Sequence, residues 1–177
     1  MRWITWLVGV WVAAWMSPVS AITIEQAYAT IHSQRAVFDP SLTTMGGDES
    51  WHLDHLFRLI DLSVKERVET LLWIQSGGRE GDGADEYESI LQQLHTLQPP
   101  QQLAVVHQLV LGAIEEQRDV LREWRNAPER VSMHHPLVLS SSGKLHEAYN
   151  RVMQLYPQED YHNRQAFYDY FCCLDFI

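Results

Sequence analysis

Apolar residues recur at helical spacing along most of this chain. Between Asp48 and Gly78 they repeat at steps of three and four, and charged residues such as Asp61 and Lys65 stand between them. This spacing puts the apolar side chains on one face of a long helix. Asp48 is a favourable N-cap for that helix, and Gly77-Gly78 supply its C-cap. The predicted inward face consists of Leu53, Phe57, Ile60, Val64, Val68 and Leu71.

Two helices are predicted in the middle of the chain. The first is capped by Asp85 with Glu88, runs to Gln98 and stops before a Pro-Pro pair. The second spans residues 101–125 and carries Gln117 on its inward face, where we expect a buried polar contact. The apolar members of that face are Leu103, Val106, Val110, Ala113, Ile114, Leu121 and Trp124.

The C-terminal part predicts two more helices. The serine run 140–142 suits the cap of a helix over residues 143–155. Pro157 stands where a first helical residue tolerates proline, so we expect the last helix over residues 157–176. One face of this last helix carries Asn163, Phe167, Tyr170, Leu174 and Ile177.

A short helix precedes all of these. Thr23 and Gln26 form a capping box, and helical spacing continues until the chain reaches Asp39-Pro40. No strand-like alternation or hairpin turn competes anywhere in the sequence. We therefore predict an all-α fold, an antiparallel bundle of about four long helices with one or two short ones.

The N-terminal residues have the pattern of a secretory signal peptide. A single basic residue, Arg2, is followed by an apolar run to Trp15, and Pro18 then precedes the small residues Val19 and Ala21. An uncleaved anchor is the alternative, but this run spans only about 20 Å as a helix against the ~30 Å of a bilayer core. We expect cleavage after Ala21, one domain over residues 22–177, and a periplasmic or extracellular location.

The charge balance limits the choice of partner. The whole chain has a formal net charge of −10, and without residues 1–21 the balance is more acidic still, because Arg2 is their only charged residue. This sign repels phosphate backbones and anionic lipid head groups, so nucleic acid and the membrane surface are excluded as partners. The 9 histidines make the surface charge strongly pH-dependent.

Two Glu-x-x-His tetrads are the most specific chemical signal. Glu49 precedes His52 by three residues, and Glu159 precedes His162 by the same spacing. On a helix this spacing places carboxylate and imidazole on one face, as in the di-iron and di-manganese bundles. Those bundles also need one Glu from each of two other helices, and Glu115 and Glu116 lie too far along their helix to supply it.

A simpler metal site fits the predicted topology. If neighbouring helices alternate in direction, one end of the bundle gathers both tetrads together with the start of the helix that bears His107. Imidazole and carboxylate ligands suit Zn, Cu, Ni or Fe. The alternative is that these residues are helix caps and surface imidazoles, since acidic residues are favoured in the first turn of a helix. The candidate ligands are Glu49, His52, His107, Glu159 and His162.

The two adjacent cysteines, Cys172 and Cys173, allow three interpretations. They could be two buried small side chains, form an intermolecular disulfide, or form a strained vicinal disulfide. Neither thiol has the nearby cations that activate a nucleophile, because Arg164 is the only basic residue among the last fifteen positions.

Two functions from different classes follow. The first is an exported, non-catalytic binding module for a protein or a small ligand, with a homodimer as one form of partner. The second is a metal-binding bundle, with a metalloenzyme as one form of it. Aromatic residues surround the last helix, which indicates either a central position in the bundle or an exposed face for a partner. They are Tyr161, Phe167, Tyr168, Tyr170, Phe171 and Phe176.

Overall fold

The structure is a computed structural model, and it describes residues 23, 26, 28–30, 35–75, 83–127, 131–132 and 134–172. All regular secondary structure in these residues is helical, which confirms the all-α prediction for this part of the chain. The elements are α2 (Gly47–Gln75), α3 (Gly83–Thr96), the 3-10 turn η1 (Gln101–Leu103), α4 (Ala104–Asn126), α5 (Pro136–Leu155) and α6 (Tyr161–Phe171).

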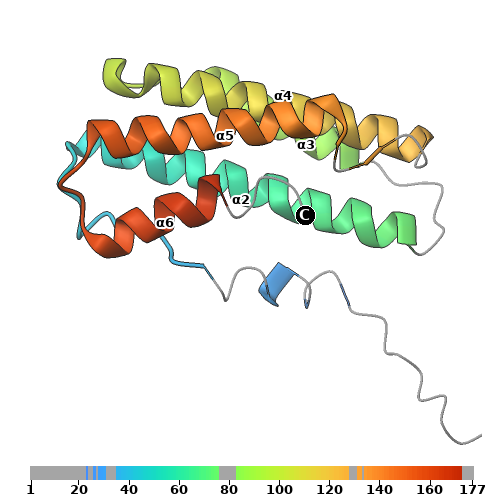
Figure 1. The fold of residues 1–177 in the computed structure, drawn as a ribbon, viewed down its shortest axis with the longest axis horizontal. Helices are drawn as coiled ribbons and strands as arrows, with labels where there is room; N and C mark the ends of the chain where they lie inside the picture. The colour runs from blue at the N-terminus through green and yellow to red at the C-terminus, as the bar shows by residue number, and fades with distance from the viewer. Residues whose placement is uncertain are drawn as a thin grey trace, which may run out of the picture.

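The helices pack side by side along one long axis (Figure 1). Helix α4 packs on α3 and α5, and α2 contacts α3, α4 and the shorter α6. One end of the molecule gathers the starts of α2, α4 and α6 with the ends of α3 and α5 (Figure 1). No helix among the described residues is long and apolar enough to cross a membrane.

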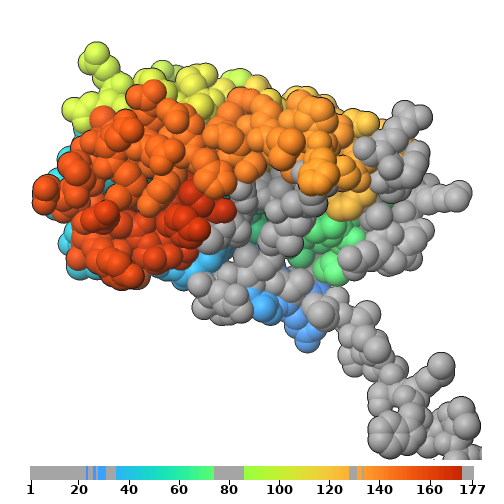
Figure 2. Space-filling model, in the orientation of Figure 1, coloured from blue at the N-terminus to red at the C-terminus, as the bar shows by residue number. Residues whose placement is uncertain are grey.

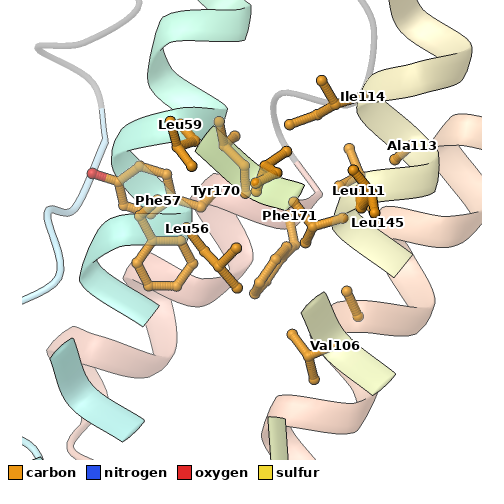
Figure 3. Close-up of a cluster of buried hydrophobic side chains, with 14 of the residues drawn as sticks. Leu56, Phe57, Leu59, Val106, Leu111, Ala113, Ile114, Leu145, Tyr170 and Phe171 are labelled. Carbon is orange, nitrogen blue, oxygen red and sulfur yellow. The ribbon is translucent and has the colours of Figure 1, made fainter. Parts of the chain in front are cut away.

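Aromatic rings form the centre of the core (Figure 3). Phe57 of α2 stacks on Tyr170 of α6 with ring centroids 4.3 Å apart, and it meets Phe171 edge-on at 5.3 Å. Phe38, which precedes α2, closes the same cluster against Phe57 and Phe167. Edge-on and offset contacts of this kind add to the free energy gained by burying the rings.

The inward faces of α2 and α4 agree with the predicted periodicity. In α2 the predicted positions from Leu53 to Val68 are buried, and Leu56 and Leu59 are buried in addition, because α2 contacts α3, α4 and α6. In α4 the predicted apolar face is buried as far as Leu121. Gln117 is 1% exposed, so its expected burial is confirmed, but its Oε1 has no hydrogen-bond partner among the described residues.

The start of α2 differs from the prediction. The helix begins at Gly47, so Asp48 lies within its first turn and the prediction that Asp48 is the N-cap is wrong. The carbonyl of Gly46 accepts the first helical hydrogen bond, from Ser50 N–H at 2.9 Å. Glu49 Oε2 reaches back to accept the Gly46 N–H at 3.0 Å, which is the reciprocal half of a capping box.

Helix α5 begins well before the serine run, so the predicted start at residue 143 is wrong. The side chain of His135 caps the helix by accepting the Leu137 N–H, and Pro136 takes the first helical position. The serines therefore lie inside the helix. Ser141 is buried there because its hydroxyl donates to the carbonyl of Val138 at 3.1 Å, so it leaves no unsatisfied donor.

The starts of α3 and α6 also differ from the prediction. Helix α3 begins at Gly83, before Asp85, and ends at Thr96, short of the predicted Gln98. Helix α6 begins at Tyr161 rather than at Pro157, because the side chain of Asp160 accepts the His162 N–H at 2.8 Å. The predicted inward residues of α6 that the structure describes, Asn163, Phe167 and Tyr170, are buried.

Several predictions fall outside the described residues. These are the signal peptide over residues 1–21, the Gly77-Gly78 cap, the position of Cys173, and most of the first helix. Where that helix begins, the capping box is confirmed, because Thr23 N–H donates to Gln26 Oε1 at 3.1 Å and Gln26 N–H donates to Thr23 Oγ1 at 3.2 Å. Cys172 is half-buried and packs against the core.

Candidate functional site

The five candidate ligands separate into two groups. Among the described residues, no three His, Cys, Asp or Glu side chains are placed where they could hold one metal ion. The structure brings His52 and His107 into contact, whereas Glu49, Glu159 and His162 bind other parts of the protein.

Glu49 works as a capping residue. Its carboxylate accepts the Gly46 N–H at the start of α2, and a Cβ added to Gly46 would lie 3.2 Å from that same oxygen. A side chain at position 46 would therefore press against the capping carboxylate. The negative charge of Glu49 also adds to burial in raising the pKa of the nearby Tyr156 hydroxyl.

Glu159 is a buried acceptor whose hydrogen bonds are filled by protein donors. Its side chain belongs to a residue that is 4% exposed. Its Oε2 accepts from Thr43 Oγ1 at 3.0 Å and from the N–H and hydroxyl of Thr44 at 3.2 and 3.1 Å, while Oε1 accepts from Asn163 Nδ2 at 2.9 Å. These contacts fasten the segment before α2 to the segment before α6.

His162 and its neighbour Asn163 add further hydrogen bonds between these two segments. The exposed imidazole of His162 donates from Nε2 to the carbonyl of Val37 at 2.8 Å. Asn163 Oδ1 accepts the Asp39 N–H at 2.9 Å, and its Nδ2 donates to the Asp39 carbonyl at 3.0 Å. The second tetrad therefore binds residues 37–44, which we call the N-terminal strap. The sequence carries no signal for these partners, which lie more than a hundred residues away.

His52 of α2 and His107 of α4 form a buried imidazole pair. The ring centroids are 5.2 Å apart and the ring planes are inclined at 45°. The two residues are 0% and 2% exposed. Both nitrogens of His52 and Nδ1 of His107 have no hydrogen-bond partner among the described residues, whereas the His107 ring also hydrogen-bonds to the backbone of Leu94.

Burial keeps both imidazoles neutral at pH 7. The pKa of His52 is lowered to about 4, mainly by burial and to a smaller extent by the neighbouring His107 and His55. Burial also lowers the pKa of His107, although the hydrogen bond to Leu94 partly raises it again. The pair therefore presents uncharged imidazole nitrogens, which are the form that binds metals.

A surface groove lies between α2 and α3. Its volume is about 530 Å³. Trp51 is 54% exposed and Leu62 is 44% exposed, so two large apolar side chains face solvent here. The His55 ring packs on the Trp51 ring with centroids 3.8 Å apart, and His55 Nδ1 donates to the Trp51 carbonyl at 2.9 Å. The groove is lined by Trp51, His55, Arg58, Leu59, Leu62, Gln93, Thr96 and Leu97.

A second groove, of about 470 Å³, lies between α5 and α6, which pack together on the face shown in Figure 2. Tyr161 is 80% exposed, and Tyr149 meets Tyr168 edge-on at 5.8 Å. Of the aromatic residues around α6, Phe167, Tyr170 and Phe171 are in the core. The structure thus contains both features expected for this helix, a buried aromatic face and exposed tyrosines.

Two further polar clusters were missed at the sequence level. Glu66 of α2 is buried, and burial together with a hydrogen bond to Glu86 raises its pKa to about 8. Ser140 and Lys144 of α5 lie 3.0 Å apart, and both donate to Glu116 of α4. These hydrogen bonds link α4 to α5.

No known protein family, curated protein or solved structure shows significant similarity to the chain. The choice between binding and metal chemistry therefore depends on the geometry of the groove and of the imidazole pair.

Proposed function

We propose that this protein is an exported, non-catalytic binding protein that holds an amphipathic helix of a partner protein in the groove between α2 and α3. The observation that carries the proposal is the exposure of Trp51 and Leu62 on the outer face of α2. Exposed apolar side chains that line one groove are typical of protein interaction surfaces, whereas single scattered ones are not. The leader pattern of residues 1–21 supports export.

The spacing along α2 suits a helical partner. Trp51, His55, Arg58 and Leu62 follow one another at steps of four, three and four, so they form a continuous outer stripe. This stripe spans three helical turns, or roughly 16 Å. An amphipathic helix with apolar residues at the same spacing would fill the groove along its length. Large enclosed pockets are more typical of small-molecule sites, whereas the described residues that line this groove come from α2, the end of α3 and Leu97 just after it.

The polar groups of the groove favour binding over catalysis. Thr96 Oγ1 donates to the carbonyl of Gln93, and His55 donates to the backbone of its own helix. Arg58 extends into solvent beside Asp54, with 2.8 Å between guanidinium and carboxylate. It places a cation at the rim, where an acidic side chain of the partner would be complementary.

Photo-crosslinking in an exporting host tests this proposal. A photoreactive amino acid at position 62 is expected to capture one partner, and mass spectrometry should locate the crosslink in an amphipathic helix. The matched control carries the same amino acid at Leu139 of α5, which is also an exposed leucine. A Trp51→Ala change should abolish capture at position 62. Equal capture at both positions, or capture of a second copy of this chain, would contradict the proposed partner.

The second candidate function is binding of a metal ion. The specific observation that favours it is the buried pair His52 and His107, with three imidazole nitrogens that have no partner among the described residues. A buried polar group without a partner costs about 1–3 kcal/mol, and a ligand that binds the nitrogens offsets this cost.

A further inference from the structure

We infer that the groove between α5 and α6 binds an acidic, proline-rich segment of a partner protein in the extended polyproline II conformation. This groove is lined by different residues from the groove between α2 and α3, so the inference goes beyond the function proposed above and is independent of it.

Tyrosine rings form the walls of the groove between α5 and α6. Tyr161 is 80% exposed and Tyr168 is 45% exposed, and Tyr149 of α5 meets Tyr168 edge-on with ring centroids 5.8 Å apart. All three rings line the groove. Exposed tyrosines that share one face are typical of binding surfaces, because each offers a large, rigid ring with a polar hydroxyl at its edge.

The spacing of these rings suits a polyproline II ligand. Tyr161 and Tyr168 lie two turns apart on α6, which is roughly 10 Å along the helix axis. A polyproline II helix has three residues per turn and rises about 3.1 Å per residue, so prolines three positions apart share one face at a distance of roughly 9 Å. One proline can therefore contact Tyr161 while the next on the same face packs beside the pair of Tyr149 and Tyr168.

The polar residues between the tyrosines favour this ligand over a helix. An amphipathic helix needs a continuous apolar stripe on its partner, whereas Arg164 and Gln165 stand between Tyr161 and Tyr168 in this groove. Aromatic-lined grooves that bind proline-rich segments contact them at separate points, and the preset conformation of such a segment lowers the entropy lost on binding.

Arg164 gives the groove a positive charge on a strongly acidic chain. The residue is exposed, and its guanidinium forms no ion pair within the part of the chain that the structure describes. The acidic side chains of α5 and α6 are engaged elsewhere, because Glu147 pairs with Arg151 and Asp169 accepts from Gln165. An acidic residue between the two prolines of the ligand would be complementary to Arg164.

NMR titration of the isotope-labelled full-length chain, as an exporting host delivers it, tests the inference. The probe is a short capped peptide that repeats Pro-Pro-Glu, and the matched peptide carries lysine at every glutamate. We expect the glutamate peptide to shift the amide signals of Tyr149, Arg164 and Tyr168. The lysine peptide should bind at least about ten-fold more weakly at low salt.

Three variants distinguish this groove from the rest of the surface. Tyr161→Ala removes an exposed ring and should weaken binding of the glutamate peptide at least about ten-fold. Arg164→Glu should reverse the preference, so that the lysine peptide binds more tightly than the glutamate peptide. The matched control is Trp51→Ala, which removes an exposed aromatic ring from the other groove and should leave peptide binding unchanged.

Several outcomes would overturn the inference. These are no binding of the glutamate peptide at about 1 mM, shifts confined to the groove between α2 and α3, and equal affinity of Arg164→Glu for both peptides. If polygalacturonate shifts the amide signals of Tyr149 and Tyr168 and the peptide does not, the ligand is an acidic polysaccharide and the assignment to a protein segment is wrong. Crosslinking at position 62 reports on the other groove, so the two proposals fail separately.

Discussion

At the scale of single residues, His52 should destabilise the metal-free protein. A neutral imidazole carries one donor and one acceptor, and neither has a partner among the described residues. Each such buried group costs about 1–3 kcal/mol. We therefore expect His52→Leu, which keeps the volume and removes the polar atoms, to raise the free energy of unfolding at pH 7 by about 1 kcal/mol. Urea denaturation measures this difference, and a loss of stability would contradict it.

The same residue makes stability depend on pH. Burial lowers the pKa of His52 from 6.5 to about 4, so the unfolded chain takes up a proton at a higher pH than the folded chain. The free energy of unfolding should fall as pH drops from 6.5 towards 4. Denaturation between pH 4 and pH 8 should show a smaller fall in His52→Leu, whereas His146→Gln should follow the wild type.

Glu66 predicts a pH dependence of the opposite sign. Its pKa is raised from 4.5 to about 8, so the folded chain keeps a proton that the unfolded chain releases. The free energy of unfolding should fall as pH rises from 4.5 to 8. Glu66→Gln imitates the protonated acid and should be more stable than the wild type by about 1–2 kcal/mol at pH 8, with little difference at pH 4. The control is Glu147→Gln on α5, a half-exposed carboxylate that pairs with Arg151.

The two Glu-x-x-His tetrads show that a residue spacing alone cannot distinguish a metal site from a helix cap. The spacing places Glu and His on one helical face, and this holds for metal ligands and for capping residues alike. Glu49 closes a cap three residues back in sequence, which the sequence itself could have indicated. Glu159 and His162 bind Thr43, Thr44 and Val37, and no local pattern predicts such distant partners.

At the scale of elements, Asn163 fastens the N-terminal strap to α6. It exchanges two hydrogen bonds with the backbone of Asp39 and donates a third to Glu159. Asn163→Ala leaves these groups without partners in a buried place, and we expect a loss of about 2–4 kcal/mol in the free energy of unfolding. Hydrogen exchange at the Asp39 amide should become faster. Gln165→Ala, on the exposed side of the same helix, is the control and should leave the Asp39 amide protected.

The existence of the helices was predictable, and their starts were not. Apolar periodicity over many turns identifies α2 and α4 because every turn repeats the same signal. A helix start depends instead on one or two hydrogen bonds, and several nearby residues can supply them. In α2 the first helical hydrogen bond is accepted by Gly46, not by the predicted cap Asp48. Helix α5 begins at Pro136, capped by His135, instead of at the serine run, and α6 is capped by Asp160 instead of beginning at Pro157. The pairing of His52 with His107 follows from the topology, but the loss of their hydrogen bonds could not be read from the sequence.

At the scale of the whole molecule, the leader pattern of residues 1–21 predicts export and can be tested directly. If residues 1–21 are a cleaved signal peptide, the protein recovered from the periplasm of an exporting host begins at Ile22. We expect Ala21→Glu to block processing, since the cleavage site needs a small residue, and Ser20→Glu to be processed normally. Intact-mass measurement distinguishes the two forms, and normal processing of Ala21→Glu would contradict the assignment of the site.

The hydrogen bonds between the N-terminal strap and the start of α6 also determine when the fold can be completed. The strap's hydrogen bonds to Glu159, His162 and Asn163 join residues separated by 115 to 125 positions, so they form only after this part of the chain has been synthesised. Contacts at such long separations slow folding and keep the chain incompletely folded until α6 is in place. If the protein is exported, as the leader pattern predicts, this order of events would keep the chain open enough to cross the membrane before it folds. Chains that end at Tyr156 should consequently expose the strap to proteases, whereas the complete chain should protect it.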